Sequence, residues 1–288
     1  MIVADPIFVI SIYTLLPMIR EKIFARIKDE SKRLSEIVRE MDRKVIIIFI
    51  SVALLQTISW YVTSRRFFRI NLFPFYQNDP DVYLYEYLYW FIGDFFSFFV
   101  FTILIIKFVL REELKNYGLQ FGEFKIGLVI SFIFFLVMLV AVWFFSSAPE
   151  FVAKYPHLLS TRNHWGNFLI YESGMFLYMI SWEFMWRGFM LFGLKEKFGY
   201  YSVLIQMLPF VILHNGKPAA ETFGAIAGGI ALGILAFRTN SFFYCVITHM
   251  GVMISIDFIS TLRYRANDYG VGVESLLNII STIFQEIK

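Results

Sequence analysis

Long stretches of apolar residues constrain this chain more than any other feature of its sequence. About 18 or more apolar residues in a row can cross the hydrocarbon core of a bilayer as a helix, and the clustering of charges leaves several such stretches. Clear spans are predicted at 45–63, 86–110, 127–146, 167–194, 201–214, 222–237 and 241–260, and a weaker one at 2–19. The fifth clear span is short, and Asp5, Pro6 and Pro17 interrupt the weak one. We therefore predict an all-α polytopic integral membrane protein with seven to eight transmembrane helices.

The composition agrees with a membrane protein and excludes several other classes. Hydrophobic residues make up 58% of the 288 and charged residues only 17%, against about 25% charged in soluble domains. The net charge of +3 gives no indication of nucleic-acid binding, so we expect no nucleic-acid partner. Cys245 is the single cysteine, which excludes a disulfide framework and a CxxC metal site.

The distribution of Lys and Arg predicts the orientation. With eight spans, 15 basic residues lie in the segments on one side, nine of them within residues 20–44, and 9 lie on the other side. The positive-inside rule then places residues 20–44 in the cytoplasm. We expect a multi-pass protein of the cell membrane, in a prokaryotic inner membrane.

Three regions are predicted along the chain. Residues 1–44 hold the weak first span and a cytoplasmic amphipathic helix, because Ile23, Ile27 and Leu34 recur at helical spacing. Residues 45–260 form the membrane domain, and residues 261–288 form a polar tail with a short surface helix. Within 222–237, Gly224, Gly228, Gly229 and Gly233 favour close helix packing.

Ionisable residues interrupt the apolar spans at a few positions. Glu183 and Arg187 are four residues apart within span 167–194, so they share one helix face and can neutralise each other. A charged residue in a span costs about 2.5–3.5 kcal/mol on insertion scales and marks a functional site by default. His214 and His249 also lie in apolar surroundings. An acid and two histidines at membrane depth are what a buried hydrolytic centre needs, and a purely structural Glu–Arg pair is the alternative.

These residues resemble a known family. Glu183-x-x-x-Arg187-Gly188, Phe210-x-x-x-His214, Lys217-Pro218-x-x-Glu221 and His249 follow the order and rough spacing of the CAAX-protease and bacteriocin-processing (Abi) family, membrane proteases similar to Ras-converting enzyme. The resemblance covers about residues 110–260. It implies eight helices around a polar cavity, and endoproteolysis of a membrane-associated peptide or protein substrate near the lipid bilayer interface.

Each site residue is assigned a role, and Glu183 takes the base role here because the family's usual water-activating Glu is replaced by Trp182. Glu183 with His214 would activate a water molecule, Arg187 would hold Glu183, and His249 would polarise the scissile carbonyl. Substrate-binding or supporting roles fall to Glu172, Phe210, Lys217, Glu221 and Asp257, where Asp257, two turns after His249 and about 80° round the helix, could support His249. We expect no cofactor and no metal, because the sequence has no HExxH motif and the family is treated as metal-independent.

Two positions depart from the family pattern and keep other functions open. Trp182 stands where the family has the first of two adjacent Glu, the one usually assigned to water activation. Met253 stands where the family has Asn or Asp four residues after the second His. The first alternative is therefore a catalytically inactive member that acts as a membrane scaffold or immunity-type protein. The second is a transporter, since intramembrane charges and Gly-rich helices also occur there.

The predicted spans leave the depth of the site residues inconsistent. Glu183 and His249 fall nearer the cytoplasmic side, whereas His214 falls near the opposite end of its short span. A tilted or re-entrant helix would bring the three residues together.

Overall fold

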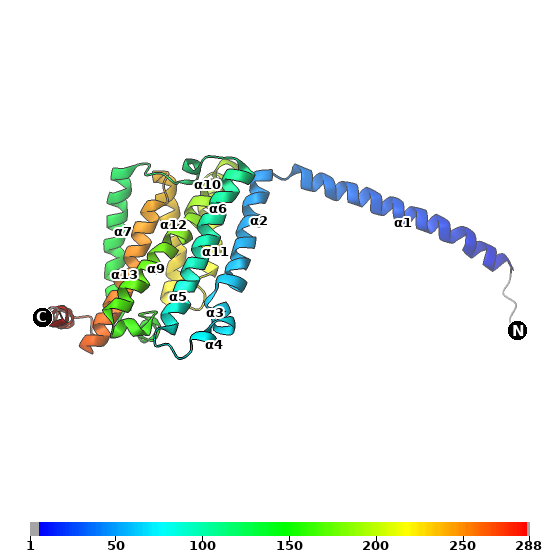
Figure 1. Ribbon diagram of the computed structural model, residues 1–288. Helices are drawn as coiled ribbons and strands as arrows, with labels where there is room; N and C mark the ends of the chain where they lie inside the picture. The colour runs from blue at the N-terminus through cyan, green and yellow to red at the C-terminus, as the bar shows by residue number, and fades with distance from the viewer. Residues whose placement is uncertain (1–5, 287–288) are drawn as a thin grey trace. The chain divides into compact units, whose positions relative to one another are not determined.

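The computed structural model describes residues 6–286, with side chains for residues 19–284. Every regular element in this part of the chain is a helix (Figure 1). The chain divides into two compact units, Met1–Ile46 and Ile47–Lys288, and each is described by itself. The predicted all-α class is confirmed.

The first unit is dominated by one long helix. Helix α1 (Pro6–Glu40) runs without interruption through Pro17. The apolar side chains of Ile23, Ile27 and Leu34 are exposed along it, as expected for an amphipathic helix. Residues 2–5 of the weak first span lie outside the described residues, so that span stays a prediction.

Five helical segments of the described chain are long and apolar enough to cross a membrane. They are Arg43–Asn71, Val82–Leu110, Phe124–Phe145, Ala219–Thr239 and Phe243–Ala266. The first comprises α2 (Arg43–Ile58), the π-helical turn η1 (Ser59–Thr63) and α3 (Arg65–Asn71). The second comprises α5 (Val82–Asp94), η2 (Phe95–Val100), α6 (Phe101–Leu104) and η3 (Ile105–Leu110), and the remaining three are α7, α12 and α13. These segments coincide with five of the predicted spans.

Predicted span 167–194 forms the centre of the second unit. It consists of α9 (Trp165–Glu183), the π-helical turn η6 (Phe184–Met190) and α10 (Leu191–Phe198), which follow one another directly. Residues 181–194 are all buried, whereas α7 leaves large apolar side chains such as Phe132 and Val137 exposed. Protein surrounds residues 181–194 of this span, which explains why it can carry Glu183 and Arg187.

The short predicted span is a short helix, α11 (Tyr201–Ile212). At about 1.5 Å per residue, its 12 residues extend about 18 Å, well below the hydrocarbon thickness of about 30 Å. His214 follows two residues after its end and therefore lies at depth. The inconsistency in depth between His214 and Glu183 is resolved because α11 stops part-way across.

Helix α12 (Ala219–Thr239) packs closely against α11 through half of its glycines. A Cβ atom on Gly229 would lie 2.9 Å from Met207 Cγ, and one on Gly233 would lie 2.7 Å from Gln206 Nε2. The Gln206 side chain also donates to the Gly229 carbonyl at 2.9 Å. Gly224 and Gly228 face open space. Close packing is thus confirmed for one face of the glycine-rich helix.

Short elements connect the spanning helices. They are α4 (Phe73–Tyr76), η4 (Leu114–Tyr117), α8 (Pro149–Lys154) and η5 (Leu159–Arg162). A further helix, α14 (Val273–Glu286), follows the last spanning helix. Ser64 begins α3 as its N-cap, since its hydroxyl accepts from the backbone N–H of Phe67 at 3.2 Å. Helix α3 lies at the end of the bundle opposite the start of α2 (Figure 1). The predicted surface helix in the tail corresponds to α14, which exposes Leu277 and Phe284.

Candidate active site

Glu183 lies at the centre of a buried polar cluster and contacts both Arg187 and His249. It ends α9, at the point where the helix passes into the π-helical turn η6, and such turns occur frequently at functional sites. Its Oε1 atom accepts from Arg187 Nη1 at 2.9 Å and from His249 Nδ1 at 2.7 Å. Both side chains of the Glu183–Arg187 pair are 0% exposed. The predicted pairing of Glu183 with Arg187 is confirmed.

Phe210 joins this cluster to the second histidine. The Arg187 guanidinium carbon lies 4.0 Å from the centre of the Phe210 ring, a cation–π arrangement. His214 Nδ1 is 2.7 Å from the Phe210 carbonyl oxygen. The Phe210 ring is 4.4 Å from the His214 ring and 6.0 Å from the His249 ring, centre to centre. Residues from α9, η6, α11 and α13 (Phe243–Ala266) therefore meet around one phenylalanine.

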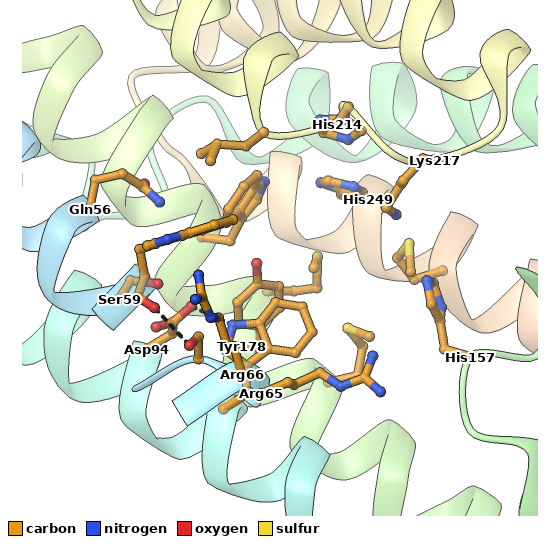
Figure 2. A pocket seen from close by; sticks show the side chains of 18 of the residues that line it. Gln56, Ser59, Arg65, Arg66, Asp94, His157, Tyr178, His214, Lys217 and His249 are labelled. Atoms are coloured by element: carbon orange, nitrogen blue, oxygen red, sulfur yellow. Dashed lines mark hydrogen bonds between the residues drawn. The ribbon is translucent and has the colours of Figure 1, made fainter. Parts of the chain in front are cut away.

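A cavity of about 360 Å³ opens in front of the two histidines, within the usual range of roughly 300–1,000 Å³ for ligand sites. Its walls come from α2, α3, α5, α8, α9, α13 and the segment after α11. Figure 2 shows His214, His249 and Lys217 together on one side of it, with Arg65 and Arg66 across from them. The residues that line the cavity include Arg65, Arg66, Asp94, Lys154, His157, Trp182, His214, Lys217, His249 and Met253.

Glu183 itself does not line the cavity. Its side chain is 0% exposed, while the side chain of His249 is 12% exposed and forms part of the cavity wall. The expectation that Glu183 touches the water molecule directly is therefore corrected. Glu183 reaches the cavity only through His249, because the carboxylate sits behind the imidazole.

Both departures from the family pattern face the cavity. Trp182 is 7% exposed and lies between the site aromatics, 6.3 Å from the His214 ring and 6.0 Å from the Phe210 ring. Met253 stands on the same wall, one turn after His249. Trp182 and Met253 thus place apolar side chains on the cavity surface, at positions where the family pattern has Glu and Asn or Asp.

Lys217 and Glu221 form a second ion pair at the mouth of the cavity. Lys217 Nζ lies 2.6 Å from Glu221 Oε1, and the Tyr155 hydroxyl donates to Glu221 Oε2 at 2.6 Å. Glu221 lies in the first turn of α12, where the helix dipole favours an acid. Only Lys217 lines the cavity.

Glu172 and Asp257 lie away from Glu183. Helix α9 is unbroken at Ser173 and Gly174, so Glu172 stays about three turns from Glu183. Asp257 Oδ1 accepts from the backbone N–H of His157 at 3.0 Å and lies 3.7 Å from His157 Nδ1. The expectation that Asp257 supports His249 is wrong, because the loop after α8 inserts His157 at this position. Burial lowers the pKa of His157, and nearby Asp257 opposes that shift.

Several residues that line the cavity were not predicted from the sequence. Arg65, Arg66, Asp94, Lys154 and His157 all line it. Asp94 is buried and accepts from Thr63 Oγ1 at 2.6 Å and Trp90 Nε1 at 2.8 Å. The Arg-rich aromatic segment after residue 63 fits interfacial anchoring equally well, so no local signal distinguished it. Among residues 6–286, no group of three or more His, Cys, Asp or Glu is arranged to hold a metal ion.

A comparison with known families matches the part of the chain that carries His214 and His249. The family described as type II CAAX prenyl endopeptidase Rce1-like matches residues 164–254. Residues 164–254 are therefore similar to this family. The match includes Glu183, Arg187, Phe210, His214 and His249 and confirms the resemblance drawn from the sequence. No curated protein and no solved structure matches the chain significantly.

The Rce1-like domain covers only part of the cavity. The matched residues line the cavity through α9, the segment after α11 and the first half of α13. The matched family is a protease family. Helices α2, α3, α5 and α8, which also line the cavity, lie before residue 164. The cavity thus joins a wall of known family to a wall that the family match does not cover.

Proposed function

We propose that the protein is a membrane endopeptidase that hydrolyses a peptide bond of a membrane-associated substrate in this cavity. The hydrogen bond of 2.7 Å between Glu183 and His249 carries the proposal. It fixes a base on the cavity wall of an Rce1-like domain. A base held in this way by a buried carboxylate is the arrangement that general-base hydrolysis needs.

His249 takes the proton of the attacking water. A carboxylate only accepts hydrogen bonds, so Nδ1 of His249 carries its proton toward Glu183 and Nε2 holds a free lone pair. Nε2 removes a proton as the water oxygen adds to the scissile carbonyl carbon. It then returns that proton to the leaving amine nitrogen, and Glu183 stabilises the imidazolium formed in between.

His214 orients the same water. Its Nδ1 donates to the Phe210 carbonyl, because a carbonyl oxygen cannot donate, and this leaves Nε2 as an acceptor for a water hydrogen. Arg187 keeps Glu183 ionised in its buried position. This assignment gives His249 the role of base, which the sequence had favoured for Glu183 with His214.

Three single substitutions test the proposal. His249→Ala, His214→Ala and Glu183→Gln should each reduce cleavage by at least about 100-fold, the lower range for loss of general-base catalysis. His164→Ala is the matched control, since His164 is an exposed loop histidine that does not line the cavity. The measurement is mass spectrometry of a membrane-peptide library incubated with the protein in liposomes. Cleavage that persists in all three variants contradicts the proposal.

A catalytically inactive, substrate-binding protein is the second candidate, supported by Trp182 and Met253 on the cavity wall. Trp182→Glu separates the two candidates. If His249 and Glu183 already perform the chemistry, a second carboxylate beside Glu183 adds like charge and cleavage should fall. If the chain has lost its base, the same substitution should create cleavage where the native chain shows none.

We also propose that the substrate enters from the membrane side on which α3 lies. The mouth residues Arg66, Lys154 and Lys217 follow the far end of α2 or belong to loops at that same end. The single native cysteine, Cys245, is 0% exposed, so introduced cysteines can be labelled selectively. An impermeant thiol reagent should label Arg66→Cys, but not Lys115→Cys, in intact cells. Labelling of Lys115→Cys alone reverses the proposed side.

A further inference from the structure

We propose that Arg66 and Lys154, at the mouth of the cavity, bind a carboxylate of the peptide, carried either by its chain end or by an acidic side chain. That the bound peptide is also a substrate rests on the function proposed above. The binding itself does not, because it uses the wall outside the Rce1-like domain.

Four cationic side chains line one cavity. They are Arg65, Arg66, Lys154 and Lys217, here called the basic mouth, and the lining contains only one acid, Asp94. They come from α3, α8 and the segment after α11, so three separate parts of the chain bring positive charge to the same opening. Figure 2 shows Arg66 and Lys217 on different sides of this opening.

Two members of the basic mouth already have an acidic partner in the protein, and Arg65 shares its partner, Glu86, with Arg69. Arg65 Nε lies 2.5 Å from Glu86 Oε1, and Lys217 Nζ lies 2.6 Å from Glu221 Oε1. Both acids lie outside the cavity lining. These two cations therefore supply hydrogen-bond donors and shape, but little net charge.

Arg66 and Lys154 have no acidic partner. Among the described residues, no hydrogen bond or ion pair forms with the Arg66 guanidinium, and Lys154 Nζ contacts only the Gly216 carbonyl, at 3.4 Å. Burial and the nearby charge of Lys217 lower the pKa of Lys154, Glu221 opposes this shift, and Arg65 adds to it. Positive charges are therefore crowded at the mouth, and an anion placed among them relieves the repulsion.

Asp94 does not cancel this charge. It is 1% exposed, and its carboxylate is occupied by the Thr63 hydroxyl and the Trp90 indole. No ion pair joins it to Arg66 within the described chain. The basic mouth thus keeps two uncompensated positive charges.

The remaining walls define the other end of the ligand. Trp60, Trp90, Tyr171, Tyr178, Trp182, Met175, Met179 and Met253 line the cavity behind the mouth. Aromatic and Met side chains bind apolar groups of varied shape. The ligand class is an apolar peptide that carries a carboxylate, and guanidinium recognition of that carboxylate supplies orientation.

The experiment measures peptide binding without turnover. Full-length His249→Ala protein in phosphatidylcholine nanodiscs is titrated with one apolar fluorescent peptide in three forms: free C-terminal acid, C-terminal amide, and amide with one internal Glu. We expect the free acid or the Glu peptide to bind at least about 10-fold more tightly than the plain amide, and the preferred form identifies the source of the carboxylate. Adding Arg66→Gln and Lys154→Gln should abolish the preference. Adding Arg69→Gln, which alters an α3 arginine outside the cavity lining, should leave it intact.

Three outcomes overturn the proposal: equal binding of all three peptides, a preference that survives loss of both cations, or binding of phosphatidylglycerol that excludes the peptide and needs the same two residues. The last would assign the mouth to lipid. Native protein that prefers carboxylate peptides but cleaves none contradicts the proposed function and leaves this inference standing. Native protein that cleaves peptides without any carboxylate preference contradicts this inference and leaves the proposed function standing.

Discussion

Two ion pairs with the same i, i+4 spacing lie in different environments, one behind the inner wall of the cavity and one at its mouth. Glu183 and Arg187, at the inner end, are both 0% exposed. Lys217 and Glu221, at the mouth, are 24% and 20% exposed. Leaving one charge of a buried pair without its partner costs about 3–5 kcal/mol, whereas exposed i, i+4 pairs contribute about 0.3–0.5 kcal/mol. Because the two pairs share their spacing, their difference in burial accounts for the difference in these energies.

The two ends also differ in whether their charged groups remain available to bind a ligand. At the inner end, Glu183 Oε1 is shared by Arg187 and His249, so the charged groups are held by one another. At the mouth, Arg66 and Lys154 remain without an acidic partner among the described residues. A fixed arrangement suits chemistry, which needs preorganised groups, and spare charge suits recognition of a ligand.

The largest expected effect is at the inner pair. Arg187→Met should lower the free energy of unfolding by about 3–5 kcal/mol, because it leaves Glu183 buried with His249 as its only partner. Reversible unfolding in mixed detergent and SDS measures it. Combining Arg187→Met with Glu183→Gln removes both charges and should regain part of the loss. If Arg187→Met costs no more than Lys217→Met, the contrast between the two ends is wrong.

An intermediate effect is expected where α12 supports the inner end. A Cβ at Gly229 would lie 3.1 Å from the Phe210 ring and 2.9 Å from Met207 Cγ, so Gly229→Ala should destabilise the fold by about 1–3 kcal/mol. It should also lower cleavage, because Phe210 holds His214. Gly228→Ala is the matched control. It meets nothing within 4 Å, so its stability should be unchanged or slightly raised. Equal losses in both variants would contradict the packing described here.

The smallest effect is expected at the mouth pair. Lys217→Met should change the free energy of unfolding by no more than about 1 kcal/mol, because its partner Glu221 keeps the Tyr155 hydroxyl and some solvent. The same SDS titration measures it, with Lys115→Met, in a loop outside the cavity lining, as the control. A loss as large as that of Arg187→Met would show that the mouth is structural.

The sequence predicted those features that depend on neighbours along the chain. Apolar stretches located the spans, since crossing a bilayer needs only a continuous run. Spacing of four placed Glu183 beside Arg187 and Lys217 beside Glu221. The same reasoning failed for Asp257, whose partner is His157 from a distant loop, and it gave no indication that Arg66 enters the cavity.

The sequence by itself determined an all-helical membrane protein with its charged pairs, because helix periodicity and hydrophobicity are local properties. Tertiary structure alone decided that His249 stands between Glu183 and the cavity, 66 residues along the chain from its partner. It also decided that α3 and α8 bring unpaired positive charge to the opening of that cavity. The physical reason is that such contacts depend on how helices cross and where α11 ends. These are set by packing between distant residues, such as Gly229 against Met207.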